Sequence, residues 1–519
     1  MRSFSGYLVA VSCWLYVVVW GALGGPAAAE NQVQLARQTY LRGEVVSVTV
    51  AGAREGLGLR LRGVTVPGSW NLALADDGST RIDTAPYRVG DYALELRRGE
   101  ETVESVGLYL RPAQRPEVWY GNFTSRPLSA GGDPYQELRD LGMNCAYLHG
   151  ISPDEALRHG IYLVVHGNAL RSVYTGLTDE QKRALGQVFM NCEGTTKAQD
   201  KVACMRNPEV IRMAGERVVE SVQEMVGYPG VMGIGVDDEV GMHAYDWNDT
   251  GGVTCYCDSC RKLWKAKTGK EPPRPVCLPP GSIIPDKDPY LRYATEWTGW
   301  ADYAGPAEAD YNQAMVEKLH RVRPDWLVFQ TPGGLYGEMD AVHWEIYSYW
   351  MSWPVTEALA SMSYVRGHHQ EKYGARKPIW PLLGWFQRTP APEWTGNYIA
   401  AQVRMCMAEG AAGIWLTLMP WYDSGGRHKQ AILAGMEHLA PAVRETGRML
   451  EQYGPALIRI TPTRYPVAVL RSRTTEMYQR VIDPKVIAAA KAEGSWTEVA
   501  WEHTQATGMG FGALLRAGA

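Results

Sequence analysis

The stretch Val231–Gly241 reads VMGIGVDDEVG, an apolar run that ends in three consecutive carboxylates. A strand of a parallel sheet is buried on both faces, so it is apolar along its length and becomes polar where it leaves the sheet. The carboxyl ends of such strands carry the chemistry of α/β barrels. The pattern predicts a buried strand whose acids, Asp237, Asp238 and Glu239, lie at a candidate active site. The alternative is an acidic loop that solvates the strand end and caps the next helix.

Strand-like segments alternate with helical patterns through residues 117–450. The segments predicted as strands are Val118–Phe123, Asn144–Leu148, Tyr162–His166, Val231–Asp237, Trp326–Gln330, Val342–Tyr349, Ile379–Phe386 and Gly413–Leu418. Eight strands that alternate with helices predict an α/β fold, namely a (β/α)8 TIM barrel.

Three helices of this region have clear signals in the sequence. Asn207 can cap a helix that begins at Pro208, and apolar residues continue along one of its faces. A second helix is predicted at Tyr311–Arg321. A third begins near His428 and runs toward Met449, and Pro441 can bend it.

The regions on either side of the barrel have their own patterns. Residues 32–113 alternate apolar and polar side chains, as Val46, Val48 and Val50 do, which predicts an N-terminal β-sandwich. Arg98-Gly99-Glu100 predicts a hairpin turn within it. Residues 455–519 restart the strand–helix pattern, and we expect a partial C-terminal α/β domain that is truncated or completed by a partner.

The first 29 residues predict a signal peptide. Arg2 precedes the apolar run Tyr7–Leu23, and Ala27-Ala28-Ala29 gives the small-residue pattern of a cleavage site. We therefore expect an exported protein, periplasmic or extracellular. The apolar run is long for a signal, so an uncleaved membrane anchor is the less favoured alternative.

Composition restricts the classes of partner. Apolar residues make up 45% of the 519 positions and charged residues 21%, which is typical of a globular protein. The formal net charge of −4 gives no support for nucleic acid or an anionic membrane as a partner. The chain has 19 Trp and 28 Tyr against 6 Phe. Rings with a polar group suit the binding of sugars as well as core packing.

Four cysteines are candidates for one metal site. Cys255, Cys257 and Cys260 are spaced too closely for separate disulfides but suit thiolates that converge on one ion. With Cys204 they would form a closed tetrahedral site, which predicts a structural zinc that joins the loop after the fourth strand to the helix before it. The alternatives are a disulfide at Cys204, or free thiols.

The remaining cysteines of the mature chain have other predicted roles. Cys145 and Cys406 lie in apolar patterns and are predicted to be core residues. A disulfide between Cys192 and Cys277 is conceivable outside the reducing cytosol.

From residue 117 onward the chain resembles family 42 β-galactosidases, within the clan of retaining barrel glycosidases. The strand ending in Glu239 is similar to the family's fourth strand, whose final Glu is the acid/base. The cluster at Cys255–Cys260 resembles its zinc loop, and Cys204 resembles its fourth zinc cysteine. The restart at Val467 is similar to its amidotransferase-like domain, which forms oligomers. The resemblance implies an oligosaccharide or polysaccharide substrate and a homo-oligomer through the C-terminal domain.

Two positions depart from the family pattern. Asp238 stands where the family has Asn. The seventh strand candidate runs into Gly384 and Trp385, where the family has its nucleophilic Glu. Glycoside hydrolysis needs two carboxyl groups, so we take Glu345, on the sixth strand candidate, as the second candidate catalytic residue beside Glu239.

Candidate substrate-binding residues are polar or aromatic side chains at or beyond predicted strand ends. They are Asp238, His166, Asn168, Trp353 and Trp421. Carboxylate, imidazole and amide groups can bind sugar hydroxyls, and indole rings can stack on sugar faces.

Three functional hypotheses follow. The first is an exported glycoside hydrolase, β-galactosidase-like, with Glu239 as acid/base. The second is a non-catalytic carbohydrate-binding barrel that lacks the nucleophile. The third is a metal-dependent hydrolase that uses Asp237, Asp238 and His243. Neighbouring residues of a strand point to opposite faces, which argues against this third hypothesis.

Overall fold

A computed structural model gives the fold of the chain. It describes residues 32–52, 55–123, 133–147, 152–190, 196–238, 255–273, 308–331, 338–346, 362, 365–366, 377–384, 396–417 and 437–459. The chain divides into two compact units, Met1–Leu110 and Arg111–Ala519, and each is described by itself. Within the described ranges, none of the helices has both the length and the apolar character that a bilayer span requires.

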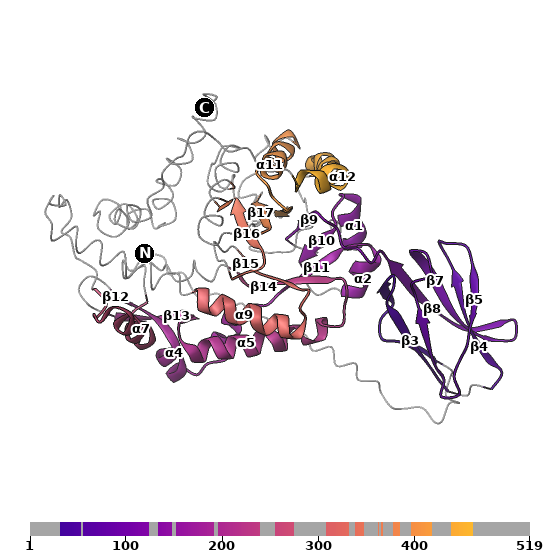
Figure 1. Ribbon diagram of the computed structural model, residues 1–519, viewed down its shortest axis with the longest axis horizontal. Helices are drawn as coiled ribbons and strands as arrows, with labels where there is room; N and C mark the ends of the chain where they lie inside the picture. The colour runs from indigo at the N-terminus through magenta and orange to yellow at the C-terminus, as the bar shows by residue number, and fades with distance from the viewer. Residues whose placement is uncertain are drawn as a thin grey trace, which may run out of the picture. The chain divides into compact units, whose positions relative to one another are not determined.

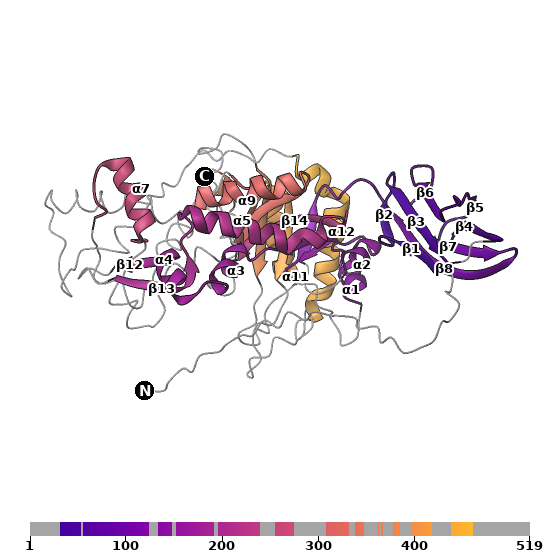
Figure 2. The ribbon, with the colours of Figure 1, turned by 90° about the horizontal axis from the view of Figure 1, so that it is seen from below.

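The amino-terminal unit consists of two antiparallel sheets that share one apolar core (Figure 2). Its strands are β1 (Gln32–Leu35), β2 (Thr39–Leu41), β3 (Val45–Ala51), β4 (Leu57–Gly63), β5 (Ser69–Leu72), β6 (Ser79–Asp83), β7 (Gly90–Arg98) and β8 (Glu101–Arg111). The sheets have the orders β1-β3-β6 and β2-β8-β7-β4-β5. The predicted alternation is confirmed, because Val46, Val48 and Val50 are at most 1% exposed. The predicted turn also forms, with Gly99 at φ +60° between β7 and β8.

The second unit is organised around a parallel sheet (Figure 1). Its strands are β9 (Trp119–Asn122), β10 (Cys145–Tyr147), β11 (Tyr162–His166), β14 (Val231–Asp238), β15 (Leu327–Thr331), β16 (Val342–Ile346), β17 (Ile379–Gly384) and β18 (Gly413–Thr417). The order is β15-β14-β11-β10-β9-β18-β17-β16. Since β15 and β16 also contact each other, the sheet curls into a nearly closed barrel. Each strand overlaps one of the predicted segments, so the barrel prediction is confirmed. The predicted C-terminal domain lies almost wholly outside the described residues.

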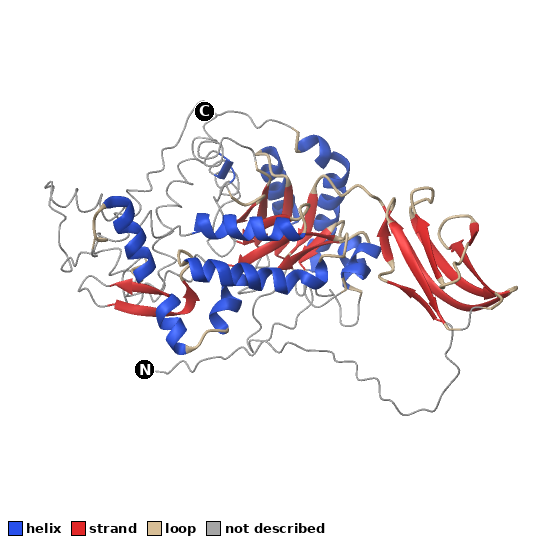
Figure 3. Ribbon diagram, turned by 60° about the horizontal axis from the view of Figure 1, so that its bottom comes forward, coloured by secondary structure: helices blue, strands red, loops and turns tan. Residues whose placement is uncertain are grey.

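Helices lie along the outside of this sheet (Figure 3). They are α1 (Pro134–Asp140), α2 (Pro153–Arg158), α3 (Ala169–Thr175), α5 (Pro208–Val222), α9 (Glu308–Val322), α11 (Gly396–Ala408) and α12 (Ala440–Leu457), with short 3₁₀ turns η1 (Gln223–Met225) and η3 (Glu437–Leu439). The helices α4 (Asp179–Leu185) and α7 (Asp258–Thr268) lie away from this sheet, beside residues 186–190 and 196–203 (Figure 3). The Asn207 side chain accepts a hydrogen bond from the backbone N–H of Glu209 at 3.0 Å, so the predicted cap of α5 is confirmed.

The helix α12 corrects one prediction. It begins at Ala440, which places Pro441 in its first turn and not at a bend. A proline in the first turn loses no intrahelical bond, since the first N–H groups of a helix have no partner there. The expected start near His428 lies outside the described residues. The helix continues to Leu457, and Gly447 packs directly against Gly142.

The hairpin of β12 (Gly186–Met190) and β13 (Thr196–Ala203) was not predicted. It stands between α4 and α5 in the chain and is rich in polar residues. Its strands pair antiparallel and lie apart from the barrel sheet. Val188 and Met190 of this hairpin pack against the cluster of Cys204, Cys255, Cys257 and Cys260 that is described below.

Side chains of the barrel strands alternate between the helices and the barrel interior. On β16, Val342, Trp344 and Ile346 pack in the outer core, so His343 and Glu345 face the interior. The interior is filled by rings that contact one another across the barrel. They are Phe123, Tyr147, His166, Phe329, His343, Trp380 and Trp415.

Candidate functional site

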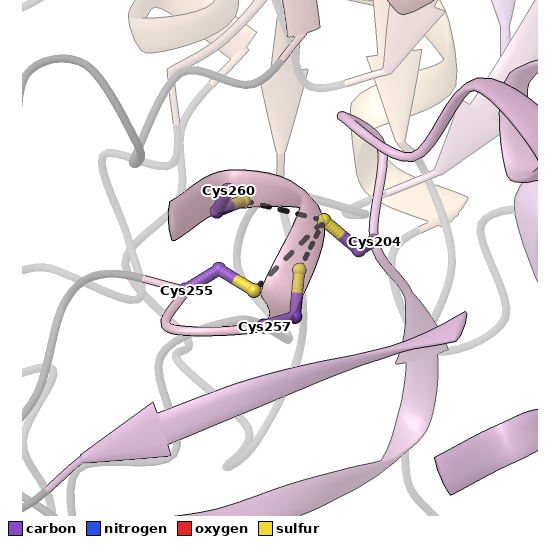
Figure 4. A group of neighbouring side chains, drawn as sticks. All are labelled: Cys204, Cys255, Cys257 and Cys260. Atoms are coloured by element: carbon purple, nitrogen blue, oxygen red, sulfur yellow. Dashed lines mark hydrogen bonds between the residues drawn. The ribbon is translucent and has the colours of Figure 1, made fainter. Parts of the chain in front are cut away.

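The four predicted cysteines come together in one buried cluster (Figure 4). The Sγ of Cys204 lies 3.5 Å from that of Cys260, 3.5 Å from that of Cys257 and 3.8 Å from that of Cys255. All four sulfurs lie within 4.8 Å of one another, and none of the four residues is more than 6% exposed. The cluster can therefore hold a metal ion.

The sulfur spacing distinguishes between the alternatives that the sequence left open. A disulfide requires sulfurs about 2.05 Å apart, and all four cysteines are free thiols. Four thiolates about 2.3 Å from one zinc ion at tetrahedral angles would be about 3.8 Å apart, which is close to the spacing observed. The alternative of a disulfide at Cys204 is therefore wrong.

Local structure around the cluster explains how distant parts of the chain hold it. Cys204 directly follows β13, and its N–H donates to the carbonyl of Leu185 at 2.8 Å. Cys257 is the N-cap of α7 and Cys260 lies in its first turn. The N–H of Tyr256 donates to the carbonyl of Val188 on β12 at 2.6 Å. As predicted, the cluster links the segment before α5 to the segment after β14, and it also includes the hairpin.

The four sulfurs interact with one another and with a backbone N–H. The backbone N–H of Val188 donates to Cys255 Sγ at 3.4 Å. The neighbouring sulfurs lower the pKa of the Cys257 thiol, and the same neighbours raise the pKa of the Cys255 and Cys260 thiols. Thiolate is the form that binds metal ions.

The other described cysteines match the prediction of core residues. Cys145 and Cys406 are fully buried, and burial raises the pKa of both thiols. Cys192 and Cys277 lie outside the described residues, so their pairing stays a prediction.

The carboxyl ends of the barrel strands bring some of the predicted site residues to one rim. His166 is the last residue of β11, and its ring contacts those of Phe123 and Tyr147. Glu345 lies near the end of β16 and is half-buried on the interior face, two residues beyond His343. Asp238 is the last residue of β14. Because all these strands are parallel, their last residues lie at the same end of the barrel.

A buried histidine lies below this rim and was not predicted. The Nδ1 of His343 is 3.4 Å from the hydroxyl of Tyr147. Burial, together with the nearby His166, lowers the pKa of His343 to about 3, so the ring stays neutral at physiological pH. The sequence signal was its position two residues before Glu345, which puts both side chains on one face of the strand.

Asn168 has an unusual backbone conformation. It is the N-cap of α3 with φ +45°, and among the described residues it alone combines a positive φ with a side chain. Its side chain makes no capping bond. A left-handed backbone costs free energy, and such residues gather at functional sites. This position just beyond β11 agrees with the predicted substrate-binding role without testing it.

Asp237 lies on the other face of the β14 end. It is fully buried, and its carboxylate accepts hydrogen bonds from the N–H of Leu170 at 2.9 Å and the hydroxyl of Tyr311 at 2.5 Å. Burial raises its pKa to about 7, although both hydrogen bonds act in the opposite direction. The hypothesis of a catalytic metal bound by Asp237, Asp238 and His243 is therefore wrong for Asp237, since both its oxygens bind the helix layer.

Three candidate residues lie outside the described residues: Glu239, Trp353 and Trp421. His243, of the metal-hydrolase hypothesis, is outside them as well. The side chain of Asp238 is likewise not described, although its backbone is. Their roles stay predictions.

Comparisons with known proteins find likeness in structure and none in sequence. No protein-family model matches the chain, and no curated protein matches its sequence. Similar solved structures include the β-galactosidase of Bacillus circulans sp. alkalophilus (15% identity, TM-score 0.47, 73% of this chain and 64% of that chain). Another is the cold-adapted β-galactosidase of Rahnella sp. R3 (12% identity, TM-score 0.49, 74% and 64%). A third is a catalytic mutant of a family 42 β-galactosidase from G. stearothermophilus (10% identity, TM-score 0.44, 72% and 63%).

The similarity to these three structures covers 72–74% of this chain. The chain spans 63–64% of the length of these three proteins. At 10–15% identity the similarity concerns the arrangement of the chain, and no site residue takes a role from it.

Proposed function

We propose that the barrel is a glycoside hydrolase that cleaves O-glycosidic bonds at the carboxyl rim. Glu239 would donate the proton to the leaving oxygen, and Glu345 would be the second carboxylate. Asp238, His166, Asn168, Trp353 and Trp421 would bind the sugar. The observation that carries the proposal is the interior-facing Glu345 at the same end of the barrel where β14 runs into Asp238 and Glu239.

The order of the strands supports a carboxyl pair. β14 and β16 lie on either side of β15 around the barrel, and the two proposed carboxyl groups follow or lie on these two strands. Carboxyl separations of about 5 Å serve retention and those of about 6.5–9.5 Å serve inversion, so the separation of the pair would determine the stereochemical outcome.

One observation favours the second hypothesis, a carbohydrate-binding barrel without catalysis. The described residues of β17, Ile379–Gly384, include no acid, although the resemblance puts the nucleophile near the end of this strand. If Glu345 does not supply the second carboxylate, the rim would bind sugars without cleaving them.

We further propose that the cysteine cluster binds a structural zinc ion. The sulfur spacing, the burial and the donor set of four thiols all fit a closed tetrahedral site. A closed site has no open coordination position for a substrate. The ion would stabilise the hairpin and α7 beside the barrel. It would take no part in the chemistry at the rim.

The test of hydrolysis compares the wild-type protein with Glu239→Gln and Glu345→Gln on a broad panel of glycans. We expect the wild type to release sugar, and each variant to lose at least 100-fold in kcat while the fold persists by circular dichroism. Azide rescue of Glu345→Ala would identify the nucleophile, and NMR of the first-formed anomer would separate retention from inversion. A wild type that binds sugars by calorimetry but cleaves none would favour the second hypothesis.

Export through the predicted signal at residues 1–29 and oligomerisation through residues 455–519 stay part of the proposal. Sequencing of the mature amino terminus, and the mass of the native protein in solution, would test them. An amino terminus at Met1 in the mature protein would contradict cleavage.

A further inference from the structure

The Asp237 carboxylate is adjacent in sequence to the residues proposed to act, but it binds the helices around the barrel. It accepts from Leu170 N–H on α3 and from the Tyr311 hydroxyl on α9, and it is fully buried. Two helices that are far apart in the chain therefore meet at one carboxylate at the end of β14.

A β-bulge gives this side chain its direction. Gly235 pairs with Phe329 of β15, whereas Asp238 pairs with Thr331, so three steps along β14 match two steps along β15. Without the extra residue Asp237 would hold the register position opposite Thr331. The bulge turns the Asp237 side chain to the helices and gives that register position to Asp238.

The first turn of α3 depends on the same carboxylate. The N-cap residue Asn168 makes no side-chain cap, and the N–H of Leu170, the second helical residue, is bound by Asp237 from another strand. The cap of α3 is thus a contact between elements, two residues after the left-handed Asn168. One carboxylate links the ends of two neighbouring strands, β11 and β14.

We propose that Asp237 is a positioning residue of the candidate active site. It holds the bulged end of β14, as far as the backbone of Asp238, against α3 and α9. This inference rests on the proposed function for its role in turnover. The hydrogen bonds that carry it are independent of any substrate.

The test uses three variants and one control in the full-length protein. Asp237→Ala removes both bonds, Tyr311→Phe removes one, and Asp237→Asn keeps an acceptor for Leu170 and can donate to Tyr311. Val218→Ala is the control, because Val218 is equally buried in the same cluster and makes no bond to Asp237. Two quantities are measured: amide exchange at Leu170, and kcat and KM on a glycan that the wild type cleaves.

We expect Asp237→Ala to speed exchange at Leu170 at least tenfold and to lower kcat at least 100-fold, with KM within threefold. Asp237→Asn and Val218→Ala should keep both quantities within fivefold of the wild type, and Tyr311→Phe should be intermediate. The inference is overturned if Asp237→Ala turns over normally, or if Asp237→Asn is as defective as Asp237→Ala.

Failure of the proposed function would look different. If the wild type cleaves no glycan, the proposed hydrolysis is refuted. Amide exchange at Leu170 then tests by itself whether Asp237 holds β14 against the helices. Unchanged amide exchange at Leu170 in Asp237→Ala would also overturn the inference that Asp237 holds α3 against the end of β14.

Discussion

The stability of the barrel should depend on pH through Asp237, and Asp237→Asn should remove this dependence. Burial raises the pKa of this carboxyl from 3.8 to about 7 in the folded protein. In the unfolded chain it has an ordinary value of about 3.9. Between these two values the folded state holds a proton that the unfolded state has released.

The sign follows from proton counting. Because the folded state binds more protons in this window, the free energy of unfolding falls as pH rises from about 4 to about 7, and it is level above that. A shift of about 3 pKa units corresponds to about 4 kcal/mol over the full window. Between pH 5 and pH 8 the remaining change is about 2.5 kcal/mol. The wild-type protein therefore loses free energy of unfolding as pH rises, whereas Asp237→Asn does not, because its side-chain amide does not titrate.

The assay is denaturant unfolding at pH 5 and pH 8, followed by tryptophan fluorescence. Among the described tryptophans all but Trp70 lie in the second unit, so this signal reports mainly on the barrel. Relative to the wild type, Asp237→Asn should gain about 2.5 kcal/mol between the two pH values. Asp310→Asn, an exposed acid on α9, is the matched control. Parallel behaviour of wild type and Asp237→Asn, within about 0.5 kcal/mol, would refute the reasoning.

Three further outcomes follow from the structure. If the cysteine cluster binds zinc as proposed, Cys204→Ser should lower the zinc content, measured by elemental analysis, and the stability by more than about 4 kcal/mol, because the variant leaves buried thiols unliganded; an unchanged metal content would contradict the site. Gly447→Ala should cost about 1–3 kcal/mol in thermal unfolding, since the added Cβ would lie 2.8 Å from the Cα of Gly142. Gly227→Ala, with nothing within 4 Å of the added Cβ, should cost less. Trp415→Ala should cost about 3–5 kcal/mol, because the ring is fully buried, and a smaller loss in denaturant unfolding would argue against a packed interior.

The barrel could be predicted from the sequence because its strands are buried on both faces. Apolar runs such as Val231–Val236 and Ile414–Leu416 are bounded by glycine or polar residues, and this local signal needs no tertiary information. The cysteine cluster was predictable for a chemical reason. Thiols at such close spacing have few other uses, so their convergence could be inferred without knowing the path of the chain between them.

Elements that depend on tertiary contacts were missed or misread. The hairpin strand Thr196–Ala203 alternates weakly and is mostly polar, so it carried no strand signal. Pro441 was read as a bend because the start of α12 could not be located from the sequence alone. A proline has opposite meanings in the first turn and in the interior of a helix.

The sequence alone distinguishes only in part between the roles of the adjacent acids Asp237, Asp238 and Glu239. Simple alternation places Asp237 and Asp238 on opposite faces, but it does not say which face each takes. The bulge decides this, and nothing in the sequence marks it. Tyr311 lies in the helix predicted at Tyr311–Arg321 and is fully buried. The carboxylate that its hydroxyl binds lies 74 residues away in the chain and could not be inferred.

The rings that fill the barrel interior determine how molecules can move through the protein. Tyr147, His343 and Trp415 contact one another across the middle of the barrel, and all three are fully buried. These contacting rings block a path along the barrel axis at this level. A saccharide bound at the carboxyl rim, as proposed, would therefore enter and leave on the rim side of these rings and would not cross the barrel.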